Sequence, residues 1–287
     1  MGQNVLITGT SSGFGNLTAL ALASRGHRVF ATMRDPDGKN REHAARLRAV
    51  QGIEVLALDV TSEPSVDAAV ASAERSAGHL DAVVNNAGHA IIGLAETITP
   101  DQLLRLFDTN VVGVQRVNRA VLPAMRARRS GLLVHVSSGL GRIVIPVVAL
   151  YGSTKFSLEA ISDAYRYELK ACGVDVTVVQ PGAYPTELGS VDPDGADQAR
   201  AKGYGALEGA LEAFHKRTIA MRSRPDAPNP QEVADAIVKL IETPAGQRPA
   251  RVAVDAMKNP LVPRLNEAHA QAQRELLQGM GMGGLAD

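Results

Sequence analysis

Short apolar runs alternate with stretches of mixed polar and apolar residues along the first two thirds of the chain. The runs are apolar at almost every position, which is typical of parallel strands covered on both faces. The stretches between them have the length and pattern of helices, so the alternation indicates βαβ units with right-handed crossovers. We expect strands at residues 5–7, 28–33, 54–58, 82–84, 132–136, 174–179 and 251–254.

Helix signals support this reading. Thr99 precedes Pro100, which places an N-cap before a proline at the first helical position. The fold class is therefore α/β: a Rossmann-like, doubly wound parallel sheet of about seven strands, with helices on both faces, in a single domain over residues 1–287. The alternation weakens after Gly182, where we expect a lid at about 186–230 and a C-terminal tail from about 260. Further helices are predicted at residues 16–24, 206–221 and 232–241, and in the tail from 261.

A glycine-rich turn joins the first predicted strand to the first helix. Its three glycines allow backbone N–H groups to approach a pyrophosphate, and the positive end of the helix dipole favours the same anion. Their spacing is wider than the usual G-x-G-x-x-G, so the glycines alone leave a simple tight connection open. The residues expected at the cofactor in this turn are Gly9, Thr10, Ser11, Ser12, Gly13, Phe14 and Gly15.

Arg34 and Asp35 follow the second strand, where NAD-binding folds usually place an acid that binds the ribose 2′-hydroxyl. Arg34 can instead bind a 2′-phosphate in a bidentate contact, and Ser11 can donate a hydrogen bond to the same phosphate. Two alternatives remain open: Arg34 as a solvated loop charge, and Asp35 as a displaced ribose acid. We expect NADP(H) as the preferred cofactor, with NAD(H) as the alternative.

Tyr151 and Lys155 are one helical turn apart, and Ser138 lies thirteen residues before the tyrosine. An ammonium on the same helix face favours a phenolate and lowers the pKa of tyrosine from its reference value near 10. The phenol can then exchange a proton with a carbonyl or alcohol oxygen, while the serine hydroxyl hydrogen-bonds that oxygen. A Tyr–Lys pair at this spacing is more often an ordinary helix-surface pair. The hypothesis therefore depends on its combination with the glycine turn.

The order of five short motifs resembles that of the classical short-chain dehydrogenases/reductases. The resemblance spans residues 4 to about 255, and the joint spacing of the motifs is very specific. The stretch 29–35 is similar to NADP-preferring members related to 17β-hydroxysteroid and retinol dehydrogenases. The motifs are Thr-Gly-x-x-x-Gly-x-Gly at 8–15, Asn-Asn-Ala-Gly at 85–88, Ser138, Tyr-x-x-x-Lys at 151–155 and Pro-Gly at 181–182.

The resemblance implies a role for each matched residue. The family's catalytic set falls on Asn110, Ser138, Tyr151 and Lys155. In relatives the lysine also binds the ribose hydroxyls, and the asparagine, in the helix that begins near Pro100, holds a water that links the lysine to solvent. The resemblance also puts a pair of residues beside the adenine, Asn-Asn-Ala-Gly beside the ribose and a threonine at the nicotinamide carboxamide. The further cofactor positions are Asp59, Val60, Asn86, Ala87, Gly88, Pro181, Gly182, Tyr184 and Thr186.

These residues predict an NADP(H)-dependent oxidoreductase that interconverts a carbonyl and a primary or secondary alcohol by hydride transfer, with Tyr151 as acid and base. Two alternatives are a catalytically silent NADP(H)-binding sensor or regulatory protein, and a 3-oxoacyl-thioester reductase. Apolar side chains after Gly182 line either a substrate pocket or the packing face of the lid helix, so we expect a mainly apolar small-molecule substrate. These side chains are Tyr184, Leu188, Tyr204, Leu207, Leu211, Phe214 and Met221.

The composition narrows the choice of partners and setting. Thirty Lys and Arg residues balance thirty Asp and Glu residues, so no net charge favours nucleic acid or an anionic membrane. Polar residues interrupt the most apolar stretch, 131–150, which excludes a membrane span there, and no cluster has the spacing of metal ligands. His135 is expected to be a hydrogen-bonded core residue, and the single Cys172 fits a reducing, cytoplasmic setting. By resemblance, the helices carrying Asn110 and Tyr151 pair chains into a homodimer or homotetramer.

Overall fold

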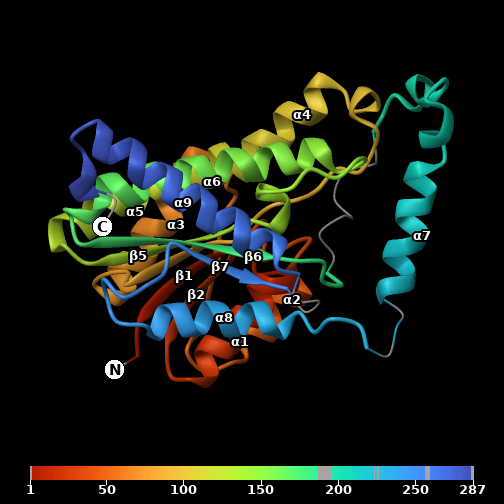
Figure 1. Ribbon diagram of the computed structural model, residues 1–287. Helices are drawn as coiled ribbons and strands as arrows, with labels where there is room; N and C mark the ends of the chain where they lie inside the picture. Colours follow the sequence, from red (N-terminus) through yellow and green to blue (C-terminus); the bar gives the residue numbers. More distant parts are fainter. Residues whose placement is uncertain (1, 187–194, 223, 225, 256–258, 286–287) are drawn as a thin grey trace.

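The computed structural model describes residues 2–186, 195–222, 224, 226–255 and 259–285 (Figure 1). Seven parallel strands form one sheet in the order β3-β2-β1-β4-β5-β6-β7. The predicted Rossmann-like α/β fold in a single domain is confirmed, and every predicted strand overlaps an observed one. The strands are β1 (Asn4–Thr8), β2 (Arg28–Met33), β3 (Ile53–Ala57), β4 (Ala82–Asn85), β5 (Gly131–Val136), β6 (Val174–Pro181) and β7 (Arg251–Val254).

Helices cover both faces of the sheet (Figure 1). One face packs against α1 (Gly13–Ser24), α2 (Arg41–Arg48) and α8 (Gln231–Glu242). The other packs against α3 (Glu63–Ala77), α5 (Gly113–Arg128) and α6 (Ala149–Lys170). Successive residues of a strand point to opposite faces, so Val5 and Ile7 contribute to the first core while Leu6 contributes to the second. This two-sided burial explains why the strands are apolar at nearly every position.

The segment from Pro100 to Arg128 is helical but not uniform. Thr99 caps α4 (Pro100–Phe107) in a capping box with Gln102, as the Thr-Pro signal predicts. A π-helical turn, Asp108–Val112, then joins α4 to α5. Asn110 therefore lies in this wider turn and not in a regular α-helix. Such turns occur often at functional sites.

The lid and the tail are predicted in the region after β6. Two short 3-10 turns, Gln198–Ala201 and Gly205–Leu207, precede α7 (Ala210–Arg222), which stands apart from the body of the molecule in Figure 1. None of residues 210–220 is buried. The C-terminal α9 (Leu261–Gly279) lies along α6 and β7. Two residues named for the apolar pocket, Leu188 and the side chain of Met221, lie outside the described residues.

Two helix starts differ from the prediction. Helix α1 begins at Gly13, not Asn16, because the end of the glycine turn already forms the first helical turn. Helix α7 begins at Ala210, not Ala206, because Gly205 has φ +57° and the residues after it form a 3-10 turn. Short 3-10 turns also occur at Ala95–Thr97, Gly139–Gly141 and Gly283–Leu285. In the part of the chain that the structure describes, no helix is both long and apolar enough to cross a bilayer.

Candidate active site and cofactor cleft

The strand order reverses between β1 and β4. Helical connections lead from β1 to β2 on one side and from β4 to β5 on the other, so a crevice opens at the carboxyl ends of these two strands. The glycine turn follows β1 there, and Asn-Asn-Ala-Gly follows β4. Topology thus brings together two motifs that are more than seventy residues apart.

Hydrogen bonds fix these two motifs to each other. Thr8 Oγ1 accepts from the backbone N–H groups of Asn86 and Ala87, both at 3.0 Å. Asn86 Nδ2 donates to the carbonyl oxygens of Thr8 and Gly9, both at 2.9 Å. Asn86 and Ala87 therefore hold the glycine turn in shape. Thr8 was not predicted as a site residue, although it opens the glycine motif.

The glycines of the turn provide a cradle that side chains would fill. Gly9 has φ +71°, and a Cβ there would lie 2.9 Å from Ala87 Cα. A Cβ on Gly15 would lie 2.5 Å from Asn86 Nδ2. Ser12 caps α1 in an extended conformation without a side-chain cap bond, and first-turn N–H groups have no partner within a helix. The cradle therefore fits the pyrophosphate of a dinucleotide.

Arg34 and Asp35 lie at the carboxyl end of β2 and are both exposed. Asp35 has φ +45°, and its Oδ2 accepts from the backbone N–H of Lys39 at 2.7 Å. Its carboxylate also occupies the space beside Gly38. The acid is thus turned into its own loop, which weakens the alternative in which Asp35 binds the ribose.

Asp59 and Val60 follow β3 at the same edge of the sheet. Asp59 Oδ1 accepts from the backbone N–H and the hydroxyl of Thr61, at 2.9 and 2.8 Å. Val60 is buried, and its carbonyl accepts from Arg116 at 3.0 Å. The backbone at Asp59 and Val60 is therefore held rigidly where the resemblance puts the adenine.

The segment after β6 closes over the glycine turn. Tyr184 packs edge-on against Phe14, with ring centroids 5.9 Å apart, and its hydroxyl donates to Glu232 at 2.9 Å. Thr186 lies beside Gly13, within 4.0 Å of where a Cβ would stand. Pro181 ends β6 beside Val254, and the N–H of Gly182 donates to the Val254 carbonyl at 2.7 Å. Tyr184 and Thr186 therefore lie against the glycine turn, whereas Pro181 and Gly182 lie at the end of β6 beside β7.

Tyr151 and Lys155 lie near the start of α6 and are each 5% exposed. Lys155 Nζ lies 5.7 Å from the centroid of the Tyr151 ring and donates to the carbonyl oxygen of Val136 at 2.9 Å. Ser138 follows β5, caps the 139–141 turn through Leu140 N–H at 3.1 Å, and forms a side-chain hydrogen bond with Tyr151. The structure therefore brings the three predicted catalytic side chains together.

Burial dominates the protonation of this group. It raises the pKa of the Tyr151 phenol above its ordinary value, and the hydrogen bond with Ser138 opposes the rise only in part. The pKa of Tyr151 is therefore raised by burial, whereas the pairing with Lys155 had predicted that it is lowered. Burial lowers the pKa of Lys155 to about 8, although the charge of Glu159 opposes this change. The helical spacing of the two residues predicted that they lie close together, but it did not predict that both are buried.

Asn110 is buried in the π-turn beside Lys155. Its Nδ2 donates to the carbonyl of His89 at 2.9 Å and to the Thr154 hydroxyl at 3.1 Å, while its Oδ1 accepts from His89 N–H at 3.0 Å. A Cβ on Gly88 would lie 3.0 Å from Asn110 Oδ1 and 3.8 Å from Lys155 Nζ. Both amide hydrogens of Asn110 donate hydrogen bonds within the protein. A water bound to this residue would therefore have to donate to Asn110 Oδ1.

His135 is fully buried in β5, as expected for a core histidine. Its Nδ1 lies 2.7 Å from Ser162 Oγ, and its Nε2 lies 3.2 Å from Asn118 Nδ2. Asn118 in turn accepts from Asn85 at 2.9 Å. Burial, with a smaller contribution from Lys155, lowers the pKa of His135 to about 3, so the ring is neutral. Among the described residues, no group of three or more His, Cys, Asp and Glu side chains is arranged to hold a metal.

Comparison with protein families and curated proteins gives a consistent result. The family model described as short chain dehydrogenase matches residues 3–195. An uncharacterized oxidoreductase of Bacillus subtilis is 34% identical over 239 residues, which cover 82% of this chain and 83% of the relative. A 3-ketodihydrosphingosine reductase of Bacteroides thetaiotaomicron is 38% identical over 184 residues, or 64% and 65% of the two chains. Retinol dehydrogenase 8 of Bos taurus is 31% identical over 277 residues, or 91% and 84%.

Solved structures share the architecture. A short-chain dehydrogenase from Streptomyces avermitilis superposes with a TM-score of 0.75 at 29% identity, over 97% of this chain and 96% of the other. ElxO with NADP bound gives 0.71 at 25% identity, over 89% and 98%. A 3-ketoacyl-(acyl-carrier-protein) reductase from Brucella melitensis complexed with NADH gives 0.71 at 26% identity, over 89% and 96%. With its site geometry and these relatives, the chain belongs to the short-chain dehydrogenase/reductase family of NAD(P)-binding oxidoreductases.

Proposed function

We propose that this chain is an NADP(H)-dependent oxidoreductase that interconverts a carbonyl and an alcohol, with Tyr151 as acid and base. The observation that carries the proposal is the convergence of Ser138, Tyr151 and Lys155 near Gly88 of the segment that holds the glycine cradle. One relative is named for reducing a ketone and another for oxidising an alcohol. Both names describe this reaction class.

In the direction of reduction, Tyr151 donates its phenolic proton to the carbonyl oxygen of the substrate. Because burial keeps the phenol protonated at neutral pH, the proton is available for this step. Ser138 hydrogen-bonds the same oxygen and stabilises the charge that develops there. NADPH, when bound, would supply the hydride. Lys155, whose ammonium the Val136 carbonyl orients, would hold the ribose hydroxyls of the bound cofactor.

The cofactor preference is assigned from the end of β2. Arg34 is exposed there and can pair with a 2′-phosphate. The carboxylate of Asp35 already accepts a hydrogen bond from the N–H of Lys39, so it is less suited to bind a ribose hydroxyl. Both observations support NADP(H) as the preferred cofactor.

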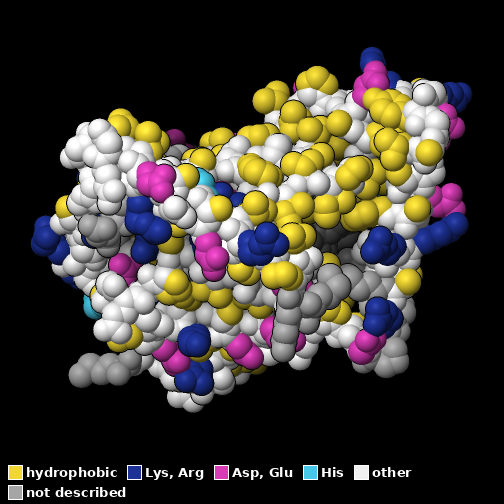
Figure 2. Space-filling model, viewed as in Figure 1, with side chains coloured by type: hydrophobic (Ala, Val, Ile, Leu, Met, Phe, Trp, Pro, Cys, Tyr) yellow, Lys and Arg dark blue, Asp and Glu magenta, His cyan; other side chains and the backbone are white. Residues whose placement is uncertain are grey.

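The lid and the substrate are also proposals. Helix α7 has no buried residue over 210–220, while the 3-10 turns before it dock on the body through Tyr204, whose hydroxyl donates to Glu96 at 2.8 Å. Weakly packed elements of this kind open at low free energy. Figure 2 shows hydrophobic side chains gathered between α4 and α7, above a hollow in the surface. A mainly apolar carbonyl or alcohol fits such surroundings.

Purified protein, NADPH and a panel of aldehydes, ketones and 3-oxoacyl thioesters test the proposal through loss of nicotinamide absorbance. Turnover of free ketones or aldehydes is expected, and Tyr151→Phe removes it while the affinity for NADPH stays within about twofold. A marked preference for thioesters would assign the chain to acyl-thioester reduction. Tight NADPH binding without turnover on the whole panel would instead support a sensor.

The proposed assembly is a homodimer or homotetramer that forms through α4 and α6. These helices contact each other, and they expose apolar side chains, among them Leu104 at 68% and Phe156 at 39%. Exposed apolar residues on adjacent helices suit an interface between copies of the chain. The single Cys172 makes the reducing cytoplasm the proposed setting.

A further inference from the structure

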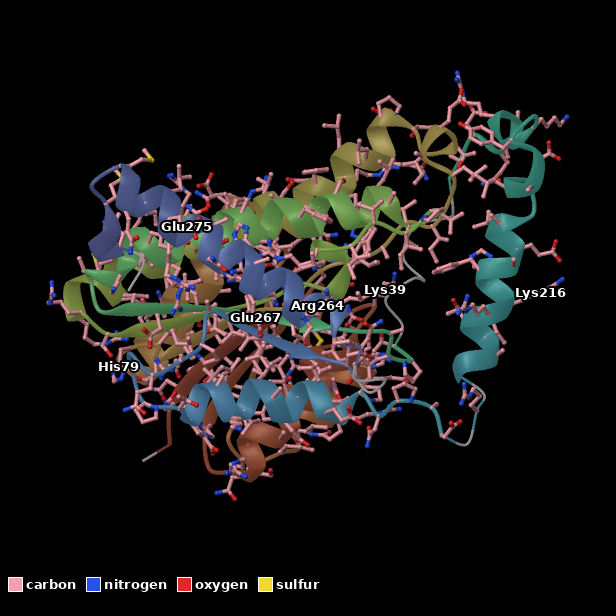
Figure 3. The ribbon with its side chains drawn as sticks, in the orientation of Figure 1. Lys39, His79, Lys216, Arg264, Glu267 and Glu275 are labelled. Atoms are coloured by element: carbon pink, nitrogen blue, oxygen red, sulfur yellow. The ribbon has the colours of Figure 1, made fainter. Side chains whose placement is uncertain are left out.

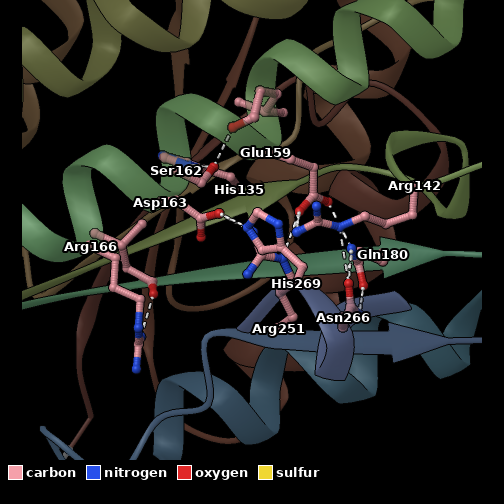
Figure 4. Close-up of polar contacts among 12 residues, drawn as sticks. His135, Arg142, Glu159, Ser162, Asp163, Arg166, Gln180, Arg251, Asn266 and His269 are labelled. Carbon is pink, nitrogen blue, oxygen red and sulfur yellow. Dashed lines mark hydrogen bonds and ion pairs between the residues drawn. The ribbon is translucent and has the colours of Figure 1, made fainter. Parts of the chain in front are cut away.

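A buried cluster of charged side chains lies behind the candidate active site, where α6, β7, α9 and the turn after Ser138 meet (Figure 4). At its centre is Glu159, which is 2% exposed. It lies on α6 one helical turn after Lys155. This carboxylate takes no part in the proposed proton transfer.

Glu159 contacts three other elements. Its Oε2 accepts from Arg251 Nε on β7 at 2.8 Å and lies 3.3 Å from Arg142 Nη2 in an ion pair. Its Oε1 accepts from Gln180 Nε2 on β6 at 2.9 Å. A single carboxylate thus ties α6 to two strands and to the residue that ends the turn after Ser138.

The contact with Arg142 leads directly to Ser138. Arg142 follows the 139–141 turn, whose last residue is held by Ser138: the Ser138 carbonyl accepts from Gly141 N–H at 2.9 Å. A Cβ on Gly141 would lie 2.9 Å from Glu159 Cγ, so the close approach of α6 to this turn requires a glycine. Fixing Arg142 therefore fixes the turn that carries the serine hydroxyl.

Helix α9 completes the cluster. Arg142 Nε donates to Asn266 Oδ1 at 3.1 Å, and Asn266 Nδ2 donates to Gln180 Oε1 at 2.7 Å. Asp163 Oδ2 lies 2.6 Å from Arg251 Nη2 and 3.1 Å from His269 Nε2. The side chains of α9 labelled in Figure 3 are exposed on its outer side: Arg264, Glu267 and Glu275. Helix α9 is thus packed against the cluster around Glu159 through its inner face.

Glu159 also acts on Lys155 through space. In the described part of the chain, the titratable groups that face Lys155 are Tyr151 and Glu159 on its own helix and His135 on β5. Of these, the tyrosine and the histidine are neutral at pH 7, so Glu159 supplies the negative charge. Arg142 and Arg251 face Glu159 from the other side. The carboxylate opposes the effect of burial and raises the pKa of Lys155.

We propose that Glu159 is a positioning residue for the reaction, which acts on Ser138 through Arg142 and on Lys155 through its negative charge. The inference rests on the proposed function, because it concerns how the same site is held. Buried ion pairs contribute little to net stability, since desolvation offsets the attraction between the charges. Conformational precision at the serine and the lysine is therefore the role that this cluster serves.

The test compares Glu159→Gln with the matched control Glu168→Gln, an exposed glutamate on the same helix. Glutamine keeps the shape and can still accept from Gln180, but it removes the charge. We expect kcat/KM for NADPH-dependent reduction to fall about 10- to 100-fold. The alkaline limb of the pH profile should move to lower pH by about one unit. The control should match the wild type in both, and Glu159→Asp should recover part of the loss.

A second variant covers the case in which Glu159→Gln fails to fold. Arg142→Gln with Glu159→Gln removes one cation and one anion together, so no uncompensated charge is left by the pair. The alkaline limb of this double variant should also move to lower pH. The inference would be overturned if a folded variant kept the wild-type kcat/KM and if the alkaline limb of its pH profile lay at the same pH as in the wild type.

A titration that does not use turnover separates this inference from the proposed function. The 13Cε shift of Lys155 in lysine-labelled protein, assigned by its loss in Lys155→Arg, should titrate at lower pH in Glu159→Gln than in the wild type. If the wild type reduced no carbonyl but this shift occurred, the proposed function would fail while the electrostatic link stood. If reduction occurred and the lysine titrated identically in both proteins, the link would be disproved.

Discussion

The ammonium of Lys155 donates a hydrogen bond of 2.9 Å to the carbonyl oxygen of Val136, two residues before Ser138. The bond joins α6 to the end of β5 and therefore connects the two elements that carry the tyrosine and the serine. It also places a cation where only 5% of its residue surface is exposed. Joining the tyrosine and the serine in this way therefore requires a buried positive charge on Lys155.

The rate of reduction should fall at alkaline pH. Burial lowers the pKa of Lys155 to about 8, whereas the pKa of Tyr151 is raised, so the lysine loses its proton first. We expect kcat/KM for reduction to be level near neutral pH and to fall above about pH 8, because kcat/KM reports groups of the free enzyme. Oxidation, which needs the phenolate, should instead speed up as the pH rises. A level reduction profile up to pH values well above 9 would contradict the assignment.

Lys155→Met should stabilise the fold and abolish activity. The folded-state pKa of Lys155 is lowered from 10.5 to about 8, so between these values the unfolded chain binds more protons and stability rises with pH. Below this window the cost of the buried charge is present in full. After allowance for the lost hydrogen bond to Val136, the variant should gain about 2 kcal/mol at neutral pH. Thermal unfolding measures this gain, and the exposed Lys170→Met on the same helix should leave the melting temperature nearly unchanged.

Gly15→Ala should weaken cofactor binding. Its Cβ would lie 2.5 Å from Asn86 Nδ2, the group that holds the carbonyl oxygens of Thr8 and Gly9. The turn must shift, and we expect the affinity for NADPH to fall by at least about tenfold in a titration of nicotinamide fluorescence. Gly279→Ala is the matched control, because an added Cβ there meets nothing within 4 Å. Equal affinities of the two variants would exclude the cradle as the pyrophosphate site.

Arg34→Ala should change the choice between the two cofactors. Loss of a guanidinium that pairs with the 2′-phosphate should raise KM for NADPH about 10- to 100-fold and leave KM for NADH nearly unchanged. Arg46→Ala, an exposed arginine on α2, controls for the general loss of positive charge. If both arginine variants kept the wild-type ratio of the two KM values, Arg34 would be a solvated loop charge.

The sequence predicted the sheet well, because burial on both faces leaves a nearly continuous apolar run in each strand. It did not reveal α2, whose residues 41–48 are mostly charged and bury only Ala44 and Leu47. Nor did it predict the π-turn at Asn110, since nothing in Asp-Thr-Asn-Val-Val distinguishes a wider turn from a regular helix.

The sequence predicted those parts of the candidate site whose geometry follows from the spacing of residues along the chain. Tyr151 and Lys155 share a helix face, and the two cofactor motifs meet because parallel strands end at one edge. The cluster around Glu159 was not predicted, because its partners Arg142, Arg251 and Asn266 come from distant segments. Its place one turn after Lys155 was the one available signal. The raised pKa of Tyr151 was not predicted either, because the spacing of residues does not show which side chains are buried.

The proposed interface gives a last prediction. Leu104 on α4 is 68% exposed, and α4 contacts α6, which exposes Phe156. A carboxylate in the centre of an apolar interface loses its hydration without a partner, which opposes association. Leu104→Glu should therefore yield a smaller species than the wild type in light scattering at equal concentration. Leu276→Glu on α9, where the side chain is 56% exposed, is the matched control and should keep the wild-type mass. If Leu104→Glu also kept that mass, or if the wild type were itself a monomer, α4 would not form the interface, and its apolar surface would instead belong to the substrate side of the molecule.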